Sequence, residues 1–359
     1  MAHNYHRIVI KIGSNVFTQK DGLPDLKRIA HLVEQIAAIK RQGKEVILVS
    51  SGAVASGRSM ISVSEKADAV AARQLLASIG QVKLINTYSK LFGAFDMLCS
   101  QILVTKEDFR DRLHYLNMRN CLEMLLQHQV IPVVNENDVV SVTELMFTDN
   151  DELAGLIASM LNAQALIILT NVDGIYNGDP KLPGSKVIEE IDNTTPEFSS
   201  FITSGRSQFG RGGMITKSTM SQKVAQLGIA VHIANGTKDN VLTNVLSNKI
   251  QHTRFVPDKT KSGKKKWIAH SVHYATGVVK VNEGAKIALT SNKATSLLPI
   301  GIVNVVADFS KGEIIKLVDE QNKLIGLGIA EYNAEKTREK IGQKNQKPLV
   351  HYDYLYLQS

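Results

Sequence analysis

The chain has 359 residues and 43% hydrophobic side chains without a low-complexity tract, which predicts a globular protein of two or three domains. No apolar run approaches the ~20 residues of a membrane-spanning helix, and the short polar start, residues 1–6, carries no secretory signal. The net charge of +8 is uneven, because residues 1–249 hold 25 Lys and Arg against 24 Asp and Glu, whereas residues 250–359 hold 17 against 10.

Six short apolar runs before residue 250 have the character of β-strands. They cover residues 8–12, 46–49, 97–104, 130–134, 165–169 and 231–234. Several are nearly continuous, which is typical of parallel strands covered on both faces. Helical periodicity separates them, as in Leu26, Ile29, Val33 and Ile36, with Gly43 as a plausible stop. Strands alternating with helices predict an α/β sandwich with a mainly parallel sheet.

The two cysteines, Cys99 and Cys121, lack the spacing of metal ligands and lie in apolar surroundings. We expect both to be buried free thiols, as in proteins of a reducing compartment. The expected location is therefore cytoplasmic.

Three glycine-containing loops, at residues 11–15, 50–53 and 210–217, follow or flank the predicted strands. Glycine lets the backbone point its N–H groups at an anion, and a following helix adds N-terminal donors. None of the loops is a Walker A motif or a GxGxxG dinucleotide fingerprint. Each alone is compatible with ordinary turn chemistry, but three loops that could converge on one sheet edge indicate an anion site.

Two of these loops carry a lysine. Lys11 lies at the end of an apolar strand, an unusual place for a charge. It is either an edge lysine whose ammonium group reaches solvent or a cation placed for a phosphoryl group. Lys217 could be a solvated helix residue, but its glycine-rich approach favours contact with an anion.

Polar clusters at residues 135–138 and 170–174 end two of the apolar runs, and a third at residues 149–152 opens a helical pattern. Open α/β sheets bind ligands beyond the carboxyl ends of their strands, so these clusters predict a small-molecule site. Asp149 and Asp151 lie where a helix N-terminus favours acids. For Asp149, an ordinary helix cap is as consistent with the sequence as a ligand role.

Residues 251–269 are charged, contain Pro257 and Gly263 and lack periodicity, which predicts a linker between a domain at 1–250 and another at 270–359. Beyond it, six short strand-like runs predict a small β-barrel. They cover residues 277–281, 286–289, 301–306, 314–318, 324–330 and 349–351. The basic excess here fits either a lysine-rich surface or contact with an anionic partner.

Six motifs, in this order and spacing, resemble the amino acid kinase family, and within it the kinases that act on glutamate. They are IVIKIGSNV (8–16), VSSGAVASGR (49–58), VVNENDVV (133–140), FTDNDELA (147–154), ILTNVDGIY (168–176) and GRGGMITK (210–217). KKWIA (265–269) and SLLPIGI (296–302) resemble the linker and PUA domain of these kinases. The resemblance implies a three-layer amino acid kinase fold followed by a small β-barrel-like PUA domain.

The resemblance also implies an activity, the ATP-dependent phosphorylation of the γ-carboxylate of L-glutamate to γ-glutamyl phosphate, the first step towards proline. It implies Mg²⁺ held mainly by the ATP phosphates rather than by metal ligands of the protein. It further implies feedback inhibition by proline at or near the glutamate site, and a homo-oligomer, either a dimer or a tetramer.

The motif positions imply roles for individual residues. The catalytic positions are Lys11, Lys217 and Asp151, the last of which orients the two lysines. The glutamate-binding positions are Ser51, Gly52, Asp138 and Asn150. The nucleotide-binding positions are Lys11, Gly13, Thr170, Asn171, Arg211, Gly212, Gly213, Met214, Ile215, Thr216 and Lys217. Asn171 departs from the aspartate that the family often has there. By its chemistry, Asp138 suits the α-ammonium group of an amino acid, whereas Asn150 and the Ser51 region suit its α-carboxylate.

Two alternatives stay open. Within the same class, the chain could be another amino acid kinase, acting on N-acetylglutamate or aspartate, although the NEND and TDND loops and the C-terminal motifs argue against it. From a different class, it could be an RNA-binding or RNA-modification protein acting through the PUA domain, with RNA as its partner. RNA binding as the main role would make affinity fall steeply with salt.

Overall fold

The computed structural model describes residues 3–64, 66–141, 147, 149–180, 182, 184–192, 213–258, 265, 268–269, 275–291 and 295–357. The chain divides into two compact units, residues 1–260 and 261–359. Each unit has its own cluster of buried hydrophobic side chains. Among the helices described, none has the length and apolar character needed to cross a bilayer.

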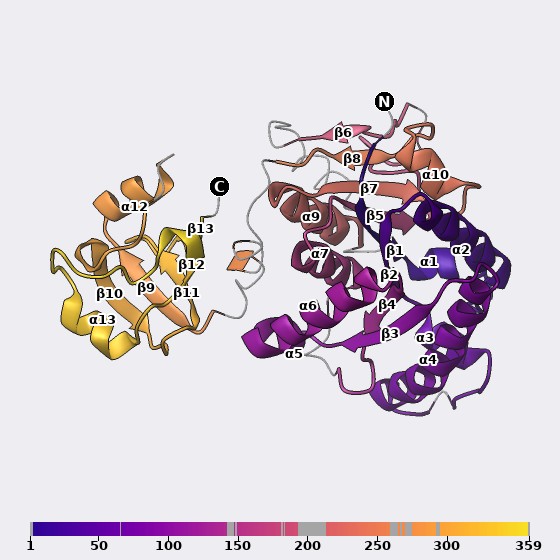
Figure 1. Ribbon diagram of the computed structural model, residues 1–359, viewed down its shortest axis with the longest axis horizontal. Helices are drawn as coiled ribbons and strands as arrows, with labels where there is room; N and C mark the ends of the chain where they lie inside the picture. The colour runs from indigo at the N-terminus through magenta and orange to yellow at the C-terminus, as the bar shows by residue number, and fades with distance from the viewer. Residues whose placement is uncertain are drawn as a thin grey trace. The chain divides into compact units, whose positions relative to one another are not determined.

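The strands of the first unit are β1 (Arg7–Ile12), β2 (Glu45–Ser50), β3 (Cys99–Val104), β4 (Ile131–Glu136), β5 (Ala165–Thr170), β6 (Glu190–Ile191), β7 (Ala230–Asn235) and β8 (Thr253–Phe255). In the described part of the unit they form one eight-stranded sheet in the order β3-β4-β2-β1-β5-β7-β8-β6 (Figure 1). Every neighbouring pair is parallel except β7 and β8. The predicted mainly parallel sheet is therefore confirmed.

All six predicted strands of this unit are present, and all but the edge strand β3 are buried along most of their length. Strands β1 and β2, for example, are buried at five of their six positions. Strand β8 was not predicted. It lies inside the segment expected to be a linker and pairs antiparallel with β7 at Val231, His232 and Ile233.

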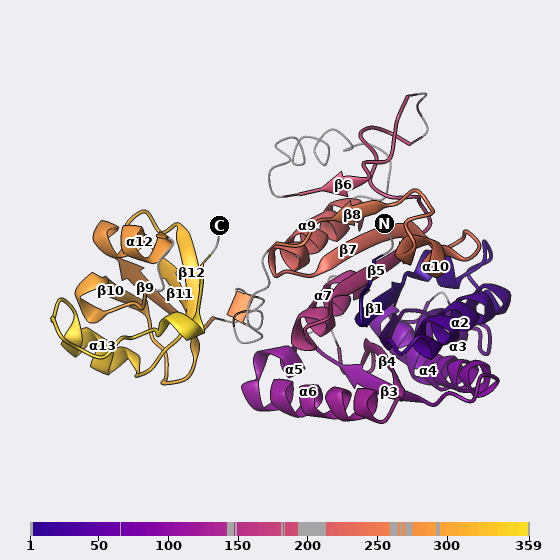
Figure 2. The same cartoon turned by 45° about the horizontal axis from the view of Figure 1, so that its top comes forward.

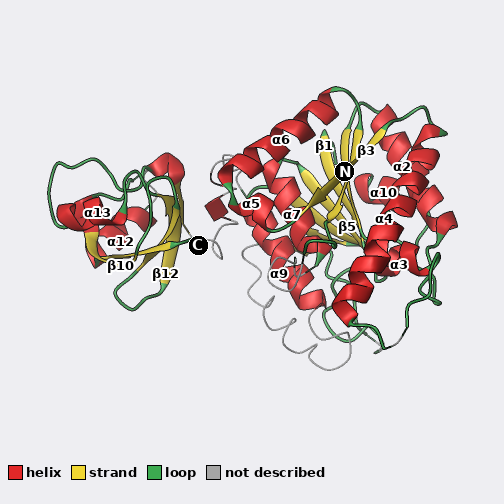
Figure 3. Ribbon diagram, turned by 90° about the horizontal axis from the view of Figure 1, so that it is seen from below, coloured by secondary structure: helices red, strands yellow, loops and turns green. Residues whose placement is uncertain are grey.

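Helices cover both faces of this sheet. They are α1 (Ser14–Phe17), α2 (Leu26–Arg41), α3 (Ala53–Arg58), α4 (Ala69–Gly93), α5 (Glu107–Arg110), α6 (Arg112–Gln127), α7 (Asn150–Met160), α9 (Gly213–Gln226) and α10 (Val241–Leu246). Figures 2 and 3 show α6, α7 and α9 on one face and α2, α3, α4 and α10 on the other. The result is the expected three-layer sandwich.

Helices α3 and α4 pack unusually closely, and glycine makes this possible. A Cβ atom added at Gly80 of α4 would lie 1.8 Å from the Ala53 carbonyl oxygen, and one added at Gly57 of α3 would lie 2.0 Å from the Leu76 carbonyl oxygen. Backbone atoms cannot give way as a flexible side chain can. Glycine at these positions therefore fixes α4 against the segment that follows β2.

The second unit contains β9 (Gly277–Val281), β10 (Ile302–Ala307), β11 (Ile314–Val318), β12 (Leu324–Ile329) and β13 (Leu355–Leu357), with helices α12 (Glu283–Thr290) and α13 (Ala334–Lys340). Its five described strands form a separate mixed sheet in the order β10-β9-β11-β12-β13. This confirms a small β-rich unit after the layered one.

Two details of the second unit differ from expectation. The predicted strand at 286–289 is wrong, because these residues belong to α12, which Asn282 caps by accepting a hydrogen bond from the Ala285 N–H at 2.8 Å. At 349–351 the structure has only an isolated bridge between Leu297 and Val350, and the strand follows at β13.

The prediction of two buried thiols is also wrong. Both cysteines are free, but Cys121 is exposed and Cys99 is half-buried. Cys121 lies on the solvent side of the amphipathic helix α6, whose buried side chains include Tyr115, Leu122 and Leu126. Cys99 begins β3, the edge strand of the sheet, where neighbours cover less of it.

Candidate active site

The carboxyl ends of the central parallel strands bring most of the predicted site residues to one edge of the sheet. Lys11 lies near the end of β1, and Ser51 follows β2 directly. Asp138 lies two residues beyond β4, while Thr170 ends β5. Adjacent parallel strands end together, so residues far apart in sequence become neighbours.

Asp151 lies between the two predicted catalytic lysines. Lys11 Nζ is 2.7 Å from Asp151 Oδ1, and Lys217 Nζ donates a hydrogen bond to Asp151 Oδ2. All three residues are buried: Lys11 is 6% exposed, Lys217 is 9% exposed and Asp151 is 1% exposed. Two ammonium groups share one carboxylate, so this buried cluster carries a net charge of +1 when all three groups are ionised.

Helix α7 holds the carboxylate in place. Asp149 caps the helix, and its side chain accepts hydrogen bonds from the backbone N–H groups of Asp151 at 2.8 Å and Glu152 at 3.1 Å. The helix cap expected as one alternative for Asp149 is thus present. Asp151 falls in the first turn of the helix, where the helix dipole favours a negative charge.

Burial and charge act in opposite directions on this cluster. Burial alone would raise the pKa of Asp151, but the charges of Lys11 and Lys217 outweigh it and hold the pKa below its usual value. Burial lowers the pKa of Lys11 below its usual value, and Asp151 opposes that shift. Asp151 therefore counteracts the burial that favours the neutral form of Lys11.

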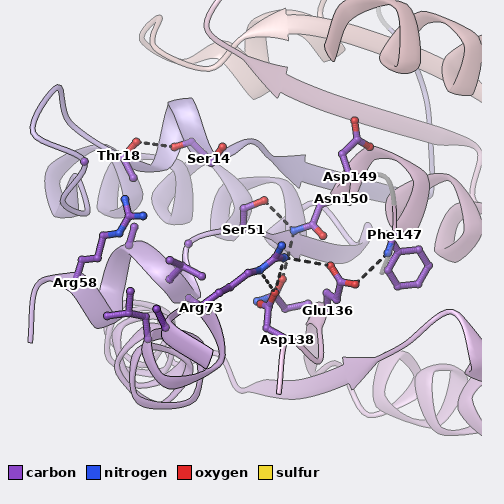
Figure 4. A pocket seen from close by; sticks show the side chains of 18 of the residues that line it. Ser14, Thr18, Ser51, Arg58, Arg73, Glu136, Asp138, Phe147, Asp149 and Asn150 are labelled. Carbon is purple, nitrogen blue, oxygen red and sulfur yellow. Dashed lines mark hydrogen bonds and ion pairs between the residues drawn. The ribbon is translucent and has the colours of Figure 1, made fainter. Parts of the chain in front are cut away.

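A cavity of about 690 Å³ opens at this edge of the sheet (Figure 4). All four residues predicted to bind the substrate line it, namely Ser51, Gly52, Asp138 and Asn150. Among the described residues that line the cavity, none is a histidine or a cysteine. The cavity therefore offers hydroxyl, amide, carboxylate and guanidinium groups, a set suited to a small zwitterionic ligand.

Ser51 and Asn150 are joined by a hydrogen bond. Asn150 Nδ2 donates to Ser51 Oγ at 2.8 Å and to Asn135 Oδ1 at 3.3 Å. Gly52 next to Ser51 has φ of +118°, and an added Cβ would lie 2.4 Å from the Phe17 ring. Only glycine fits this turn, which sets the direction in which Ser51 enters the cavity.

Arg73 of α4 is a cavity residue that sequence reasoning missed. Its Nε and Nη2 donate to Asp138 Oδ1 at 3.0 and 2.6 Å, and Nη2 lies 3.8 Å from Glu136 Oε2 (Figure 4). Burial raises the pKa of Glu136. The hydrogen bond from the Phe147 backbone N–H and the charge of Arg73 oppose this rise. No motif spacing links Arg73 to β4, because the packing of α4 creates this contact.

None of the predicted nucleotide positions is among the described residues that line this cavity, and Gly13 lies against Lys11. An added Cβ at Gly13 would lie 3.0 Å from the Leu169 carbonyl oxygen and 3.5 Å from Lys11 Nζ, so glycine keeps the approach to the lysine open. Thr170 Oγ1 donates to Asn171 Oδ1 at 3.4 Å. The residues that precede Lys217 at the start of α9 are Gly213, Met214, Ile215 and Thr216. Arg211 and Gly212 lie outside the described residues.

The acids near the site are engaged within the protein. Asp151 binds the two lysines, and Asp173 accepts from Lys238 Nζ at 2.7 Å and Asn235 Nδ2 at 2.9 Å. Within the described residues, no three His, Cys, Asp or Glu side chains form a group that could hold a metal ion. The described side chains therefore do not fit a metal cage built by the protein alone.

Comparisons with known proteins agree with the fold and the motifs. The model of the amino acid kinase family matches residues 6–235, and that of the PUA domain matches residues 277–352. The chain is 49% identical to a glutamate 5-kinase of Bacteroides thetaiotaomicron over 100% of both chains, and 51% identical to one of Chlorobaculum tepidum over 98% of both. The carbamate kinase of Giardia lamblia bound to AMP-PNP shares the fold, with a TM-score of 0.52 at 19% identity over 70% of this chain and 99% of that one.

Proposed function

The chain belongs to the amino acid kinase family and carries a PUA domain, and we propose that it transfers the γ-phosphoryl group of ATP to the γ-carboxylate of L-glutamate. The product is γ-glutamyl phosphate. One observation carries the proposal. Two buried lysines share a single carboxylate at the edge of the sheet where polar side chains line a cavity that suits an amino acid. The relatives named glutamate 5-kinase, similar over the full chain, support glutamate as the acceptor.

The lysines answer the main electrostatic demand of the reaction. A carboxylate oxygen forms a bond to the γ-phosphorus while the bond to the bridging oxygen of ADP breaks, and both reactants are anions. Catalysis of phosphoryl transfer depends mostly on positioning and on neutralising charge on the transferred group. Lys11 and Lys217 are buried, so their charges act with little screening by solvent.

The reaction requires no general base. The γ-carboxylate of glutamate is ionised near neutral pH and can attack as it is. The cavity lining, which includes no histidine or cysteine among the described residues, suits such a reaction. We assign Asp151 to aligning the lysines rather than to proton transfer, because both of its oxygens face ammonium groups.

We assign recognition of glutamate to Ser51, Gly52, Asp138 and Asn150. Asp138 offers a carboxylate to the α-ammonium group, and among the described residues the contacts that Arg73 makes with it are both on Oδ1. The turn at Ser51 and Gly52 offers hydroxyl and backbone donors. We expect substitution of any of these side chains to raise KM for glutamate more than KM for ATP.

We assign the nucleotide to Lys11, Gly13, Thr170, Asn171 and the segment 211–217, on the strength of their motif positions. The close approach that glycine permits at residue 13 fits a phosphate group beside Lys11. Since the described acids do not fit a metal cage, we expect Mg²⁺ to be held mainly by the phosphates of ATP, and we assign no step to it.

The same proposal places the reaction at the first step towards proline, with proline as a feedback inhibitor at or near the glutamate site. In this proposal proline would occupy part of the cavity of about 690 Å³ that the four substrate positions line. Competitive inhibition would raise KM for glutamate without lowering kcat. Inhibition that lowers kcat at saturating glutamate would contradict a shared site.

The substrate is tested by measuring ATP consumption with glutamate, N-acetylglutamate and aspartate side by side. We expect kcat/KM for glutamate to exceed the other two by at least about 100-fold, because an unpaired polar group in a closed site is costly. Comparable or higher turnover of either alternative acid would replace glutamate as the acceptor. The amino acid kinase assignment would stand in that case.

A further inference from the structure

A chain of hydrogen-bonded amides connects α4 to the substrate residues. Asn135 Nδ2 donates to Gln81 Oε1 at 3.0 Å, and Asn150 Nδ2 donates to Asn135 Oδ1 at 3.3 Å and to Ser51 Oγ at 2.8 Å. Gln81 is 8% exposed and Asn135 is 2% exposed. We define these four residues, Gln81, Asn135, Asn150 and Ser51, as the amide relay.

The relay has a direction. An amide nitrogen has two protons, and both protons of Asn150 Nδ2 are used, one for Ser51 and one for Asn135. Asn150 is therefore left with its carbonyl oxygen, an acceptor, to offer a ligand. Ser51 Oγ accepts from Asn150, so its own O–H is left to donate. Figure 4 shows the Asn150 nitrogen turned towards Ser51.

The direction originates at Gln81. Because Gln81 presents its oxygen to Asn135 Nδ2, the oxygen of Asn135 faces Asn150 and fixes the orientation of that amide. Gln81 Nε2 is buried without a hydrogen-bond partner in the described structure. An unpaired buried donor has a cost, and the contact through Oε1 is maintained in spite of it.

The backbone beside Gln81 cannot move easily. Gly80 lies against the Ala53 carbonyl oxygen, where even a Cβ would come within 1.8 Å. Ala53 follows the Ser51–Gly52 turn directly. Helix α4 thus holds Gln81 in a fixed relation to Ser51 at one end of the relay and to Asn135, on β4, in its middle.

We propose that Gln81 and Asn135 are positioning residues that set how Asn150 and Ser51 meet the amino acid. The inference rests on the proposed function and refines it. The Asn150 oxygen accepts from the α-ammonium group, next to Asp138, and the Ser51 hydroxyl donates to a carboxylate. This differs from the expectation that Asn150 donates to the α-carboxylate. Neither Gln81 nor Asn135 belongs to the catalytic positions. Gln81 is not among the residues that line the cavity and acts through Asn135, which lines the cavity and orients Asn150.

The test compares Gln81→Met with Gln81→Glu. Methionine has a similar size but removes the acceptor, which frees the amides of Asn135 and Asn150 to rotate. We therefore expect KM for glutamate to rise about tenfold, as for the loss of one well-placed interaction. KM for ATP and kcat should stay within about twofold of wild type. Glutamic acid, neutral when buried, keeps a carbonyl oxygen for Asn135, so we expect it to restore KM to within about threefold of wild type.

Gln35→Met is the matched control. Gln35 of α2 is 3% exposed, and its Oε1 accepts from the Leu242 backbone N–H at 2.8 Å, away from the residues that line the cavity. It removes a buried acceptor of the same kind, so it should lower thermal stability without changing KM for glutamate. An equal rise of KM in Gln35→Met would show a general effect of stability and overturn the relay.

Two further measurements keep the inference falsifiable. In an Asn150→Ala background, Gln81→Met should add less than about twofold to KM, because its route of action is gone. The glutamate concentration that gives half of the ligand-induced rise in Tm should increase about tenfold in Gln81→Met, without any turnover. If Gln81→Met does not fold, Asn135→Ala breaks the same relay and should give the same split.

Unchanged KM for glutamate in folded Gln81→Met or Asn135→Ala would overturn the inference, and so would full additivity with Asn150→Ala. Wild-type protein serves as the reference for the proposed function itself. Glutamate-dependent turnover in wild type with no effect of the substitutions rejects only the relay, whereas no such turnover in wild type rejects the proposed substrate.

Discussion

At the scale of single residues, the site depends on one carboxylate that serves two lysines. Removing a partner from a buried ion pair is strongly destabilising, about 3–5 kcal/mol, because an unpaired charge stays behind. Here the loss of stability should be smaller, because Asp151 keeps Lys11 as a partner when Lys217 is removed. The site can therefore be probed at Lys217 without loss of the fold.

Lys217→Ala should lower kcat by about 10²–10³, the usual effect of removing one preorganised charge donor. Thermal stability should change little, because Asp151 remains paired with Lys11. Lys223→Ala is the control, as Lys223 is an exposed residue on the same helix, α9. An unchanged kcat in folded Lys217→Ala would refute the role of this lysine in transfer.

Asp151→Asn should move the alkaline limit of kcat to lower pH. Burial lowers the pKa of Lys11, and the Asp151 charge is the main effect that raises it again. Without that charge the pKa of Lys11 falls further, so Lys11 loses its proton, and kcat declines, at a lower pH than in wild type. The pH profile of kcat measures this, and a limit that stays in place or moves to higher pH would contradict the alignment role of Asp151.

Sequence and resemblance together singled out Lys11, Lys217 and Asp151, which the structure brings into contact. Lys11 ends an apolar strand and Asp151 opens a helix, and both positions are visible in the sequence. Arg73 and Gln81 were missed because neither has a local signature. Each lies within a long helical pattern, and only the packing of α4 brings Arg73 to Asp138 and Gln81 to Asn135.

At the scale of elements, long apolar runs were predictable and short mixed runs were not. Strands β1, β2 and β5 are near-continuous apolar runs, buried at five of their six positions. Residues 286–289 form a short mixed run, Lys-Ile-Ala-Leu, which is too short to separate strand from helix by periodicity. The Asn282 cap was the signal that could have decided for α12. Strand β8 has three residues and depends on pairing with β7.

The contact between α3 and α4 gives a prediction at this scale. Gly80→Ala should lower Tm by about 2–12 °C, because the new Cβ would overlap the Ala53 carbonyl oxygen, overpacking costs about 1–3 kcal/mol, and each kcal/mol shifts Tm by about 2–4 °C in a unit of this size. It should also raise KM for glutamate, since Ala53 follows the Ser51–Gly52 turn. Scanning calorimetry and steady-state kinetics measure the two effects.

Gly93→Ala, at the end of the same helix, is the control. A Cβ there would meet nothing within 4 Å, so Tm should stay constant or rise slightly through better helix propensity. If both variants lose stability equally, the close contact between α3 and α4 does not limit stability, and the structural explanation for Gly80 fails.

At the scale of the whole molecule, two units with separate cores share one chain. The predicted active-site residues all belong to the first unit, and the match to the PUA domain belongs to the second. Calorimetry should therefore show two unfolding transitions. Glutamate and a non-hydrolysable ATP analogue should raise the first unit's transition, by about 2.7 kcal/mol of stability for a ligand at 100 times its Kd. A single transition that shifts as one would contradict independent units.

The most direct test of the account is the product itself. Wild-type protein is incubated with ATP, Mg²⁺, glutamate and hydroxylamine, which converts an acyl phosphate into a stable hydroxamate. We expect γ-glutamyl hydroxamate to form in proportion to ADP, to require both ATP and glutamate, and to fall about 10²–10³-fold in initial rate in Lys217→Ala. ATP consumption without glutamate-dependent hydroxamate would contradict phosphoryl transfer to the glutamate carboxylate.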